Sequence, residues 1–116
     1  MNRVSFIGNV GNEPTTTVLE SGTVVMNFDI GTSETYTNKE GQPAKKNEWH
    51  RIVAWNDTAR KIQQHLHKGS FVSIKAKAIN REYDQIITHP VTKTRSVDIT
   101  VKRKVTEYKA FEIAIL

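Results

Sequence analysis

Two tryptophans with an arginine between them are the residues of this chain best suited to bind a ligand. They fall in the run from Glu48 to Trp55, whose β-branched and aromatic residues predict a strand. Side chains on a strand alternate between its faces, so Trp49, Arg51 and Trp55 share one face. At about 3.3 Å per residue the two indoles lie roughly 20 Å apart, which leaves room for two separate planar groups. We interpret this face as a platform for bases.

The alternative is that both tryptophans belong to the core, where aromatic residues are usually found. Arg51 argues against it, because the guanidinium would then point into apolar surroundings without a partner. The opposite face carries His50, Ile52 and Ala54, a compact set that suits an interior. We therefore expect the tryptophan face to point outward.

Length and charge narrow the classes of partner. A chain of 116 residues is long enough for one domain with a core and too short for two. Its net charge of +5 favours nucleic acid or an anionic membrane surface. No apolar run approaches the roughly 20 residues of a membrane span, so we expect no membrane partner. Without cysteine, disulfides and thiolate catalysis are excluded, and without a secretory signal pattern we expect a cytoplasmic protein.

The first half of the chain reads as strands separated by turns. Residues 3–10 predict a strand, and residues 14–19 predict a short extended segment. Clean alternation over residues 24–33 predicts a half-buried strand. Its inward side chains are Val24, Met26, Phe28 and Ile30. Residues 34–47, which are almost devoid of apolar side chains, predict a long hairpin arm with its tip at Asn38–Gly41.

One helix is expected directly after the tryptophan strand. Asn56, Asp57 and Thr58 offer N-cap side chains, and Gly69 sits where a C-terminal cap belongs. The apolar stripe between them predicts a three-turn helix that plugs one end of the fold.

The second half of the chain predicts two more strands. Alternation over residues 71–83 turns one set of side chains inward and a basic and aromatic set outward. The inward set is Val72, Ile74, Ala76 and Ala78, and the outward set is Lys75, Lys77, Arg81 and Tyr83. We expect residues 84–96 to form a second long loop. The last core strand is then expected from Val97, Ile99, Val101 and Val105.

Together these elements predict an all-β protein. Five strands with one short α-helix between strands 3 and 4 match the Greek-key barrel called the OB-fold, which presents a strand face and loops to oligonucleotides or oligosaccharides. We expect residues 1–105 to form this domain. Residues 106–116 are expected to form a C-terminal extension, with an extra strand as one option.

Several short motifs follow one another along residues 2–101. They are Asn2-Arg3-Val4, Gly8-Asn9-Val10-Gly11 with Pro14, Thr32-Ser33-Glu34, Glu48-Trp49-His50-Arg51-Ile52-Val53 and Lys68-Gly69-Ser70. In order and spacing they resemble the bacterial single-stranded DNA-binding proteins, the SSB family. The resemblance implies sequence-independent binding and protection of single-stranded DNA in replication, recombination and repair.

The resemblance also implies which residues touch the DNA. The four aromatic positions of the family that stack on bases match Tyr36, Trp49, Trp55 and Tyr83. The basic matches are Arg3, Arg51 and Arg81, to which our face argument adds Lys75 and Lys77. His50 matches a family histidine near a subunit interface. The family implies a homotetramer, with a homodimer as the alternative.

Members of the family continue into a Gly/Gln-rich stretch and an acidic tip that recruits replication and repair enzymes. This chain ends at Ile113-Ala114-Ile115-Leu116 with neither, so those protein partners are left open. The four histidines lack the helical spacing of a zinc pair, and we expect no metal, no cofactor and no catalytic residue. Two alternatives stay open: a metal-dependent nuclease on the same barrel, and an adaptor of the same fold that works through protein contacts.

Overall fold

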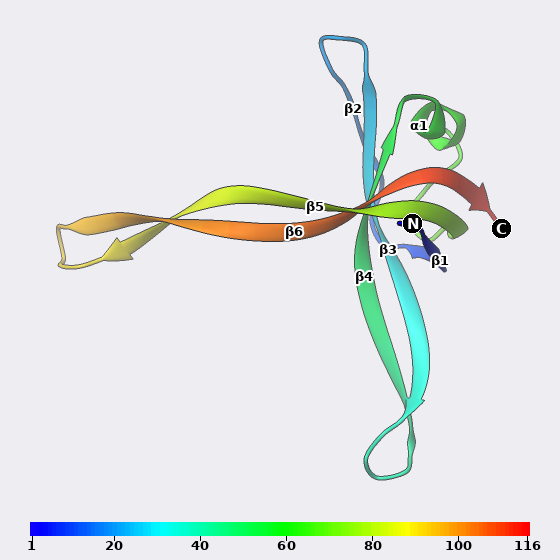
Figure 1. Ribbon diagram of the computed structural model, residues 1–116, viewed down its shortest axis with the longest axis horizontal. Coiled ribbons are helices and arrows are strands. Elements are labelled where there is room, and N and C mark those ends of the chain that lie inside the picture. Colours follow the sequence, from blue (N-terminus) through cyan, green and yellow to red (C-terminus); the bar gives the residue numbers. More distant parts are fainter.

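The computed structural model describes all residues 1–116 and contains six strands and one short helix (Figure 1). The strands are β1 (Val4–Val10), β2 (Thr15–Val18), β3 (Val24–Thr37), β4 (Pro43–Trp55), β5 (Phe71–Pro90) and β6 (Ser96–Ile115). The helix α1 (Asn56–Ile62) follows β4 directly. It is too short and too polar to cross a membrane.

Five of the strands close into a barrel. They follow the order β1-β5-β6-β4-β3, and β3 returns to β1 through the pairs Asn9↔Gly31 and Val10↔Ile30. Every pairing is antiparallel except that of β4 with β6. The short β2 only extends β3 at its beginning. The predicted OB-fold is thus confirmed, and α1 lies between the third and fourth strands of the barrel.

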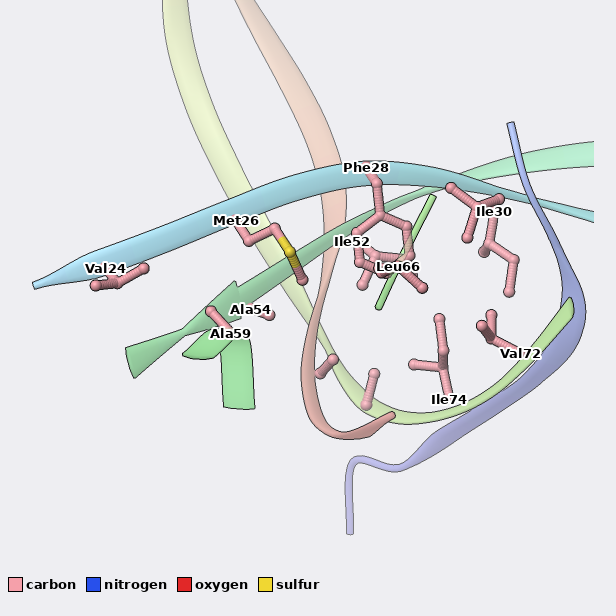
Figure 2. Close-up of a cluster of buried hydrophobic side chains, with 13 residues drawn as sticks. Val24, Met26, Phe28, Ile30, Ile52, Ala54, Ala59, Leu66, Val72 and Ile74 are labelled. Atoms are coloured by element: carbon pink, nitrogen blue, oxygen red, sulfur yellow. The ribbon is translucent and has the colours of Figure 1, made fainter. Parts of the chain in front are cut away.

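The interior of the barrel is built by the alternation that the sequence predicts. Inward side chains of β3, β4 and β5 converge there and are almost completely buried (Figure 2). They are Val24, Met26, Phe28, Ile30, Ile52, Ala54, Val72, Ile74 and Ala76. Ala59 of α1 and Leu66, which follows the helix, belong to the same buried cluster. Burying such side chains contributes roughly 1.5–3 kcal/mol for each large one.

The helix differs from the predicted three turns. It has seven residues, Trp55 occupies the N-cap position without a side-chain hydrogen bond, and Gln63 is the C-cap. Asn56, expected as a cap, instead accepts a hydrogen bond from the Val24 backbone N–H at 3.1 Å. Gly69 lies well past the helix, with a φ of +90° that glycine tolerates and other residues disfavour.

Two hairpins leave the barrel as long arms (Figure 1). Residues 32–37 and 43–48 form the β3–β4 arm, which confirms the predicted hairpin and its tip. Residues 80–90 and 96–106 form the longer β5–β6 arm. The arms raise the radius of gyration to 18.6 Å, whereas a compact domain of this length would have about 13 Å.

The β5–β6 arm corrects two expectations. Residues 84–96 were expected to be a loop, but β5 continues to Pro90 and pairs with β6, leaving only residues 91–95 as the turn. The last core strand was expected at Val97, Ile99, Val101 and Val105, yet none of them is buried, and Val97 and Ile99 are about half exposed. They lie on the arm, where no second layer covers the sheet.

Residues 106–116, and not the segment from Val97 to Val105, supply the last strand of the barrel. The boundary expected after residue 105 falls inside β6, which runs on to Ile115. Ala110 is buried in the core, and Tyr108 pairs with Ile52 of β4. The end of β6 therefore closes the barrel between β5 and β4.

Candidate nucleic-acid interface

The outer face of β4 carries the two tryptophans. Ile52 and Ala54 point inward and are completely buried, so the alternating residues Trp49, Arg51 and Trp55 point outward. Trp49 is 66% exposed and Trp55 is 38% exposed. Both indoles thus have ring surface open to a ligand.

Trp49 is held in place by glycines. Gly31 is its cross-strand partner on β3, and Gly11 approaches from the segment after β1. A Cβ atom at Gly31 would lie 2.8 Å from the indole Cζ3, and one at Gly11 would lie even closer to the same atom. The indole therefore rests against bare backbone on one side, which fixes the ring while most of its surface stays exposed.

A hollow next to Trp49 is lined by polar side chains. Asn9, Ser33 and Asn47 surround it, and Lys45 is its only charged residue. The Ser33 hydroxyl donates a hydrogen bond to the Asn47 side chain at 2.6 Å. A ligand in this hollow could stack on the indole of Trp49, form hydrogen bonds with neutral side chains and contact one cation, Lys45.

Arg51 lies between the tryptophans and pairs with its cross-strand neighbour Asp29. Its Nε donates to the Asp29 Oδ1 at 3.2 Å, and both side chains are substantially exposed. Exposed pairs of this kind contribute about 0–1 kcal/mol to stability. The effect of Asp29 is chiefly to orient the guanidinium.

Two basic residues from other strands, Lys109 and Arg81, lie near Trp55. The ammonium of Lys109 on β6 lies 5.8 Å from the centre of the indole, within the range of a cation–π contact. Lys77 pairs with Lys109 across the β5–β6 ladder. Arg81 lines a hollow together with Trp55. Lys77 and Arg81 were predicted, whereas Lys109 was not. Lys109 lies in the last part of β6, which pairs with β4, and no local feature of the sequence indicated that pairing.

The next outward residue along β5 is Tyr83. It is 45% exposed and stands on the same side of the β5–β6 arm as Arg81, opposite Arg103 of β6. This row extends the aromatic and basic surface from Trp55 onto the arm. Arg103, whose Nε donates to the Gln85 side chain, is a second basic residue that sequence reasoning missed.

Three predicted residues lie apart from this surface. Lys75 points outward but forms an ion pair with Glu112 at 3.2 Å, and it lines neither of the hollows beside the tryptophans. The guanidinium of Arg3 lies 5.5 Å from the centre of the Phe111 ring. Tyr36, 51% exposed, alternates to the face of the β3–β4 arm opposite that of Trp49.

His50 belongs to a half-buried aromatic cluster. Its ring stacks on Phe6 at 4.4 Å between centroids, and Tyr108 meets both rings edge-on. Its Nε2 shares a hydrogen bond with the Thr32 hydroxyl at 2.9 Å. This cluster joins β1, β4 and β6.

Comparison with known proteins gives a consistent family. The model described as the single-strand binding protein family matches residues 1–107. Single-stranded DNA-binding protein 1 of Chlorobaculum tepidum is 39% identical over 84 residues, which are 72% of this chain and 52% of that protein. The single-stranded DNA-binding protein of Neisseria meningitidis serogroup A is 34% identical over 83 residues, 72% of this chain and 48% of that protein. The chain thus spans about half the length of these relatives.

Solved structures agree on the fold. A Plasmodium falciparum SSB in complex with ssDNA superposes with a TM-score of 0.80 at 23% identity, covering all of this chain and 95% of that one. The wild-type single-stranded DNA binding protein from Thermus aquaticus gives a TM-score of 0.76 at 17% identity, covering all of this chain and 50% of that one. At these identities the likeness concerns the barrel architecture.

Proposed function

This chain belongs to the single-strand binding protein family, and from that premise we propose that it binds and protects single-stranded DNA without strong dependence on sequence. The observation that carries the proposal is the pair of exposed indoles on the outer face of β4. Trp49 and Trp55 lie among Arg51, Arg81 and Lys109, so rings and cations share one surface.

Stacking on the exposed rings supplies one part of the proposed affinity. A base stacked on an aromatic ring contributes about 1–3 kcal/mol, a value measured on single-strand binding proteins themselves. Trp49 and Trp55 offer two such contacts, and Tyr83 adds a third along the arm. Tyr36 serves as a fourth in this proposal when the strand wraps around the β3–β4 arm to reach its other face.

The basic residues supply an electrostatic part of the affinity, which does not depend on the base sequence of the DNA. Arg51, Lys77, Arg81 and the added Lys109 would contact phosphates, and binding should weaken as salt rises because counterions are released. Arg3 and Lys75 would act at the margin of the surface. Duplex DNA keeps the faces of its bases stacked on one another, so it has no access to the rings. Preference for single strands follows.

A fluorescence titration tests this proposal. Oligo(dT) added in low salt with EDTA should quench the tryptophan emission stoichiometrically, and a duplex of the same length should not. Unchanged emission with oligo(dT) contradicts the stacking model. Loss of intact strand on adding magnesium would identify a nuclease, and weak DNA binding with tight capture of a replication protein would identify an adaptor.

We also propose that the chain assembles with itself, as a homotetramer or, alternatively, a homodimer. From Val4 to Ile7, β1 has a ladder partner on only one side, β5, so its other edge is open. Ile7, on this strand, is 61% exposed. An exposed apolar side chain beside an open edge suits a second subunit. His50, in the aromatic cluster beside β1, would then lie near the interface.

The cellular role follows from the proposed binding. Coating of single strands serves replication, recombination and repair, and we place the protein in the cytoplasm and assign it no catalytic step. Proteins of replication and repair would be partners only through surfaces of this domain or through sequence beyond it.

A further inference from the structure

The hollow beside Trp55 has a composition unlike the hollow beside Trp49. It has a volume of about 370 Å³, within the range of about 300–1,000 Å³ usual for small-molecule sites. Leu19, Val25 and Val53 form an apolar part of its wall. Trp55, Arg81 and Glu107 supply a ring, a cation and a carboxylate. A planar ligand would find apolar contact together with charged groups of both signs.

Glu107 is the unexpected member of this group. A carboxylate on a surface proposed to meet phosphates repels them, yet this side chain is only 15% exposed and is held in place. Its Oε1 forms an ion pair with the Nη2 of Arg81 at a distance of 2.8 Å. The pair therefore presents a fixed acceptor beside the remaining donors of a guanidinium.

That combination matches the edge of one base better than the others. Guanine presents two adjacent N–H donors, N1–H and the 2-amino group, next to the acceptor O6. A carboxylate accepts both donors while a neighbouring guanidinium donates to O6. Thymine presents a single N–H between two carbonyl oxygens, and these would face the carboxylate. Cytosine and adenine each offer the carboxylate only one donor group on this edge.

We propose that the hollow beside Trp55 reads the edge of the stacked base and favours guanine over thymine there, through Glu107 and Arg81. This inference rests on the proposed binding of single-stranded DNA. The preference is confined to one position, because the hollow beside Trp49 holds no carboxylate and only one charged residue, Lys45. Binding along the rest of the strand stays tolerant of sequence.

Competition binding tests the inference in low salt with EDTA. The competitors are oligo(dT) and the same oligomer with isolated thymidines replaced by deoxyguanosine or by deoxyinosine, which lacks the 2-amino group. Isolated substitutions prevent quadruplexes. For the unaltered chain we expect the guanine oligomer to bind about five- to tenfold more tightly than oligo(dT), the low end for a bidentate base contact. The inosine oligomer should fall between them.

Three variants assign the effect to the carboxylate. Glu107→Gln should bring the guanine and thymine affinities within about twofold, because an amide cannot accept from both donors. Glu107→Asp, which keeps the charge but retracts it, should also lose most of the preference. Glu112→Gln is the matched control: Glu112 lies on the same strand and pairs with Lys75, but outside the hollow. It should keep the preference of the unaltered chain.

The outcomes separate this inference from the proposed function. Equal binding of all three oligomers by the unaltered chain overturns the inference and leaves single-strand binding standing. A guanine preference that persists in both Glu107 variants, with circular dichroism showing that they are folded, also overturns it. Failure of every oligomer to bind the unaltered chain would instead refute the proposed function.

Discussion

The indole of Trp49 rests on the backbone of Gly31, its partner across the β3–β4 ladder. A side chain at Gly31 would meet the ring at 2.8 Å, so the glycine both supports the indole and decides where it lies. The exposed ring is thereby oriented before any ligand arrives. Such an arrangement reduces the entropy lost when a base stacks.

Replacing this glycine should move the ring. We expect Gly31→Ala to weaken binding of oligo(dT) by about 1 kcal/mol, the low end of one stacking contact, because the indole must turn to accommodate the methyl group. In a Trp55→Phe background Trp49 is the only tryptophan, and its emission maximum reports the displacement. Thr35→Ala, on the same face of β3, is the control. Unaltered emission and affinity in Gly31→Ala would show that the glycine does not set the ring position.

Lys109 should contribute to the salt dependence of binding. In Lys109→Ala the slope of the logarithm of the binding constant against the logarithm of salt concentration should become shallower by about 0.7, the value for one phosphate contact on a single strand. Titrations at several salt concentrations measure the slope. Lys61→Ala, on α1 and outside both tryptophan hollows, should keep the full slope. Equal slopes for both variants would remove Lys109 from the interface.

Acid should weaken the contact of Glu13, in the segment after β1, with His67 and Lys68, in the segment before β5. The side chain of His67, bonded to Glu13 at 2.9 Å, and the backbone N–H of Lys68 hold the pKa of the Glu13 carboxyl below its usual value of 4.5. A folded-state pKa below the unfolded one stabilises the fold above the unfolded value, and this contribution is lost as pH falls through the lowered value.

Glu13→Gln should therefore lower the urea midpoint at neutral pH, and the difference from the unaltered chain should shrink as pH falls below the ordinary carboxyl range. Urea unfolding at a series of pH values checks this. Glu20→Gln, in the exposed turn before β3, serves as the control and should leave the midpoint close to that of the unaltered chain. A difference for Glu13→Gln that persists unchanged in acid would show that its carboxylate is not the cause.

A charge on the outer face of β1 should disturb self-assembly. Ile7→Glu places a carboxylate beside the open edge, and we expect its mass by light scattering to fall below that of the unaltered chain. Val18→Glu changes a similarly exposed side chain on β2, which is 67% exposed, and should leave the mass unaffected. A monomer mass for the unaltered chain would refute the proposed assembly.

Four of the five barrel strands, β1, β3, β4 and β5, could be predicted from the sequence because each has one covered face. Met26 and Phe28 on β3 and Ile74 on β5 are buried as alternation requires. The outward direction of Trp49 could be predicted for a related reason: Arg51 has the same parity, and a guanidinium resists burial. Both inferences use the pleat of a single strand and need no knowledge of its neighbours.

Ile99 shows what alternation leaves undecided. The residue lies on a strand with an apolar face, opposite Ile87 of β5, but it is 47% exposed because the β5–β6 arm has left the barrel. A pattern reports that a face is apolar and does not report which element covers it. Glu107 and Lys109 were missed for the same reason. Their position beside Trp55 depends on the course of β6 across β4, which no local signal describes.

The uninterrupted ladder of the β3–β4 arm limits how its length can vary. It runs from Val25↔Trp55 to Thr37↔Pro43 without a bulge. Adding one residue to each strand would turn every side chain beyond the insertion to the opposite face. Arms longer by two residues per strand would instead keep Tyr36 and Lys45 on their present sides. Functional grafts and natural variants of this hairpin should therefore differ in length by steps of two residues per strand.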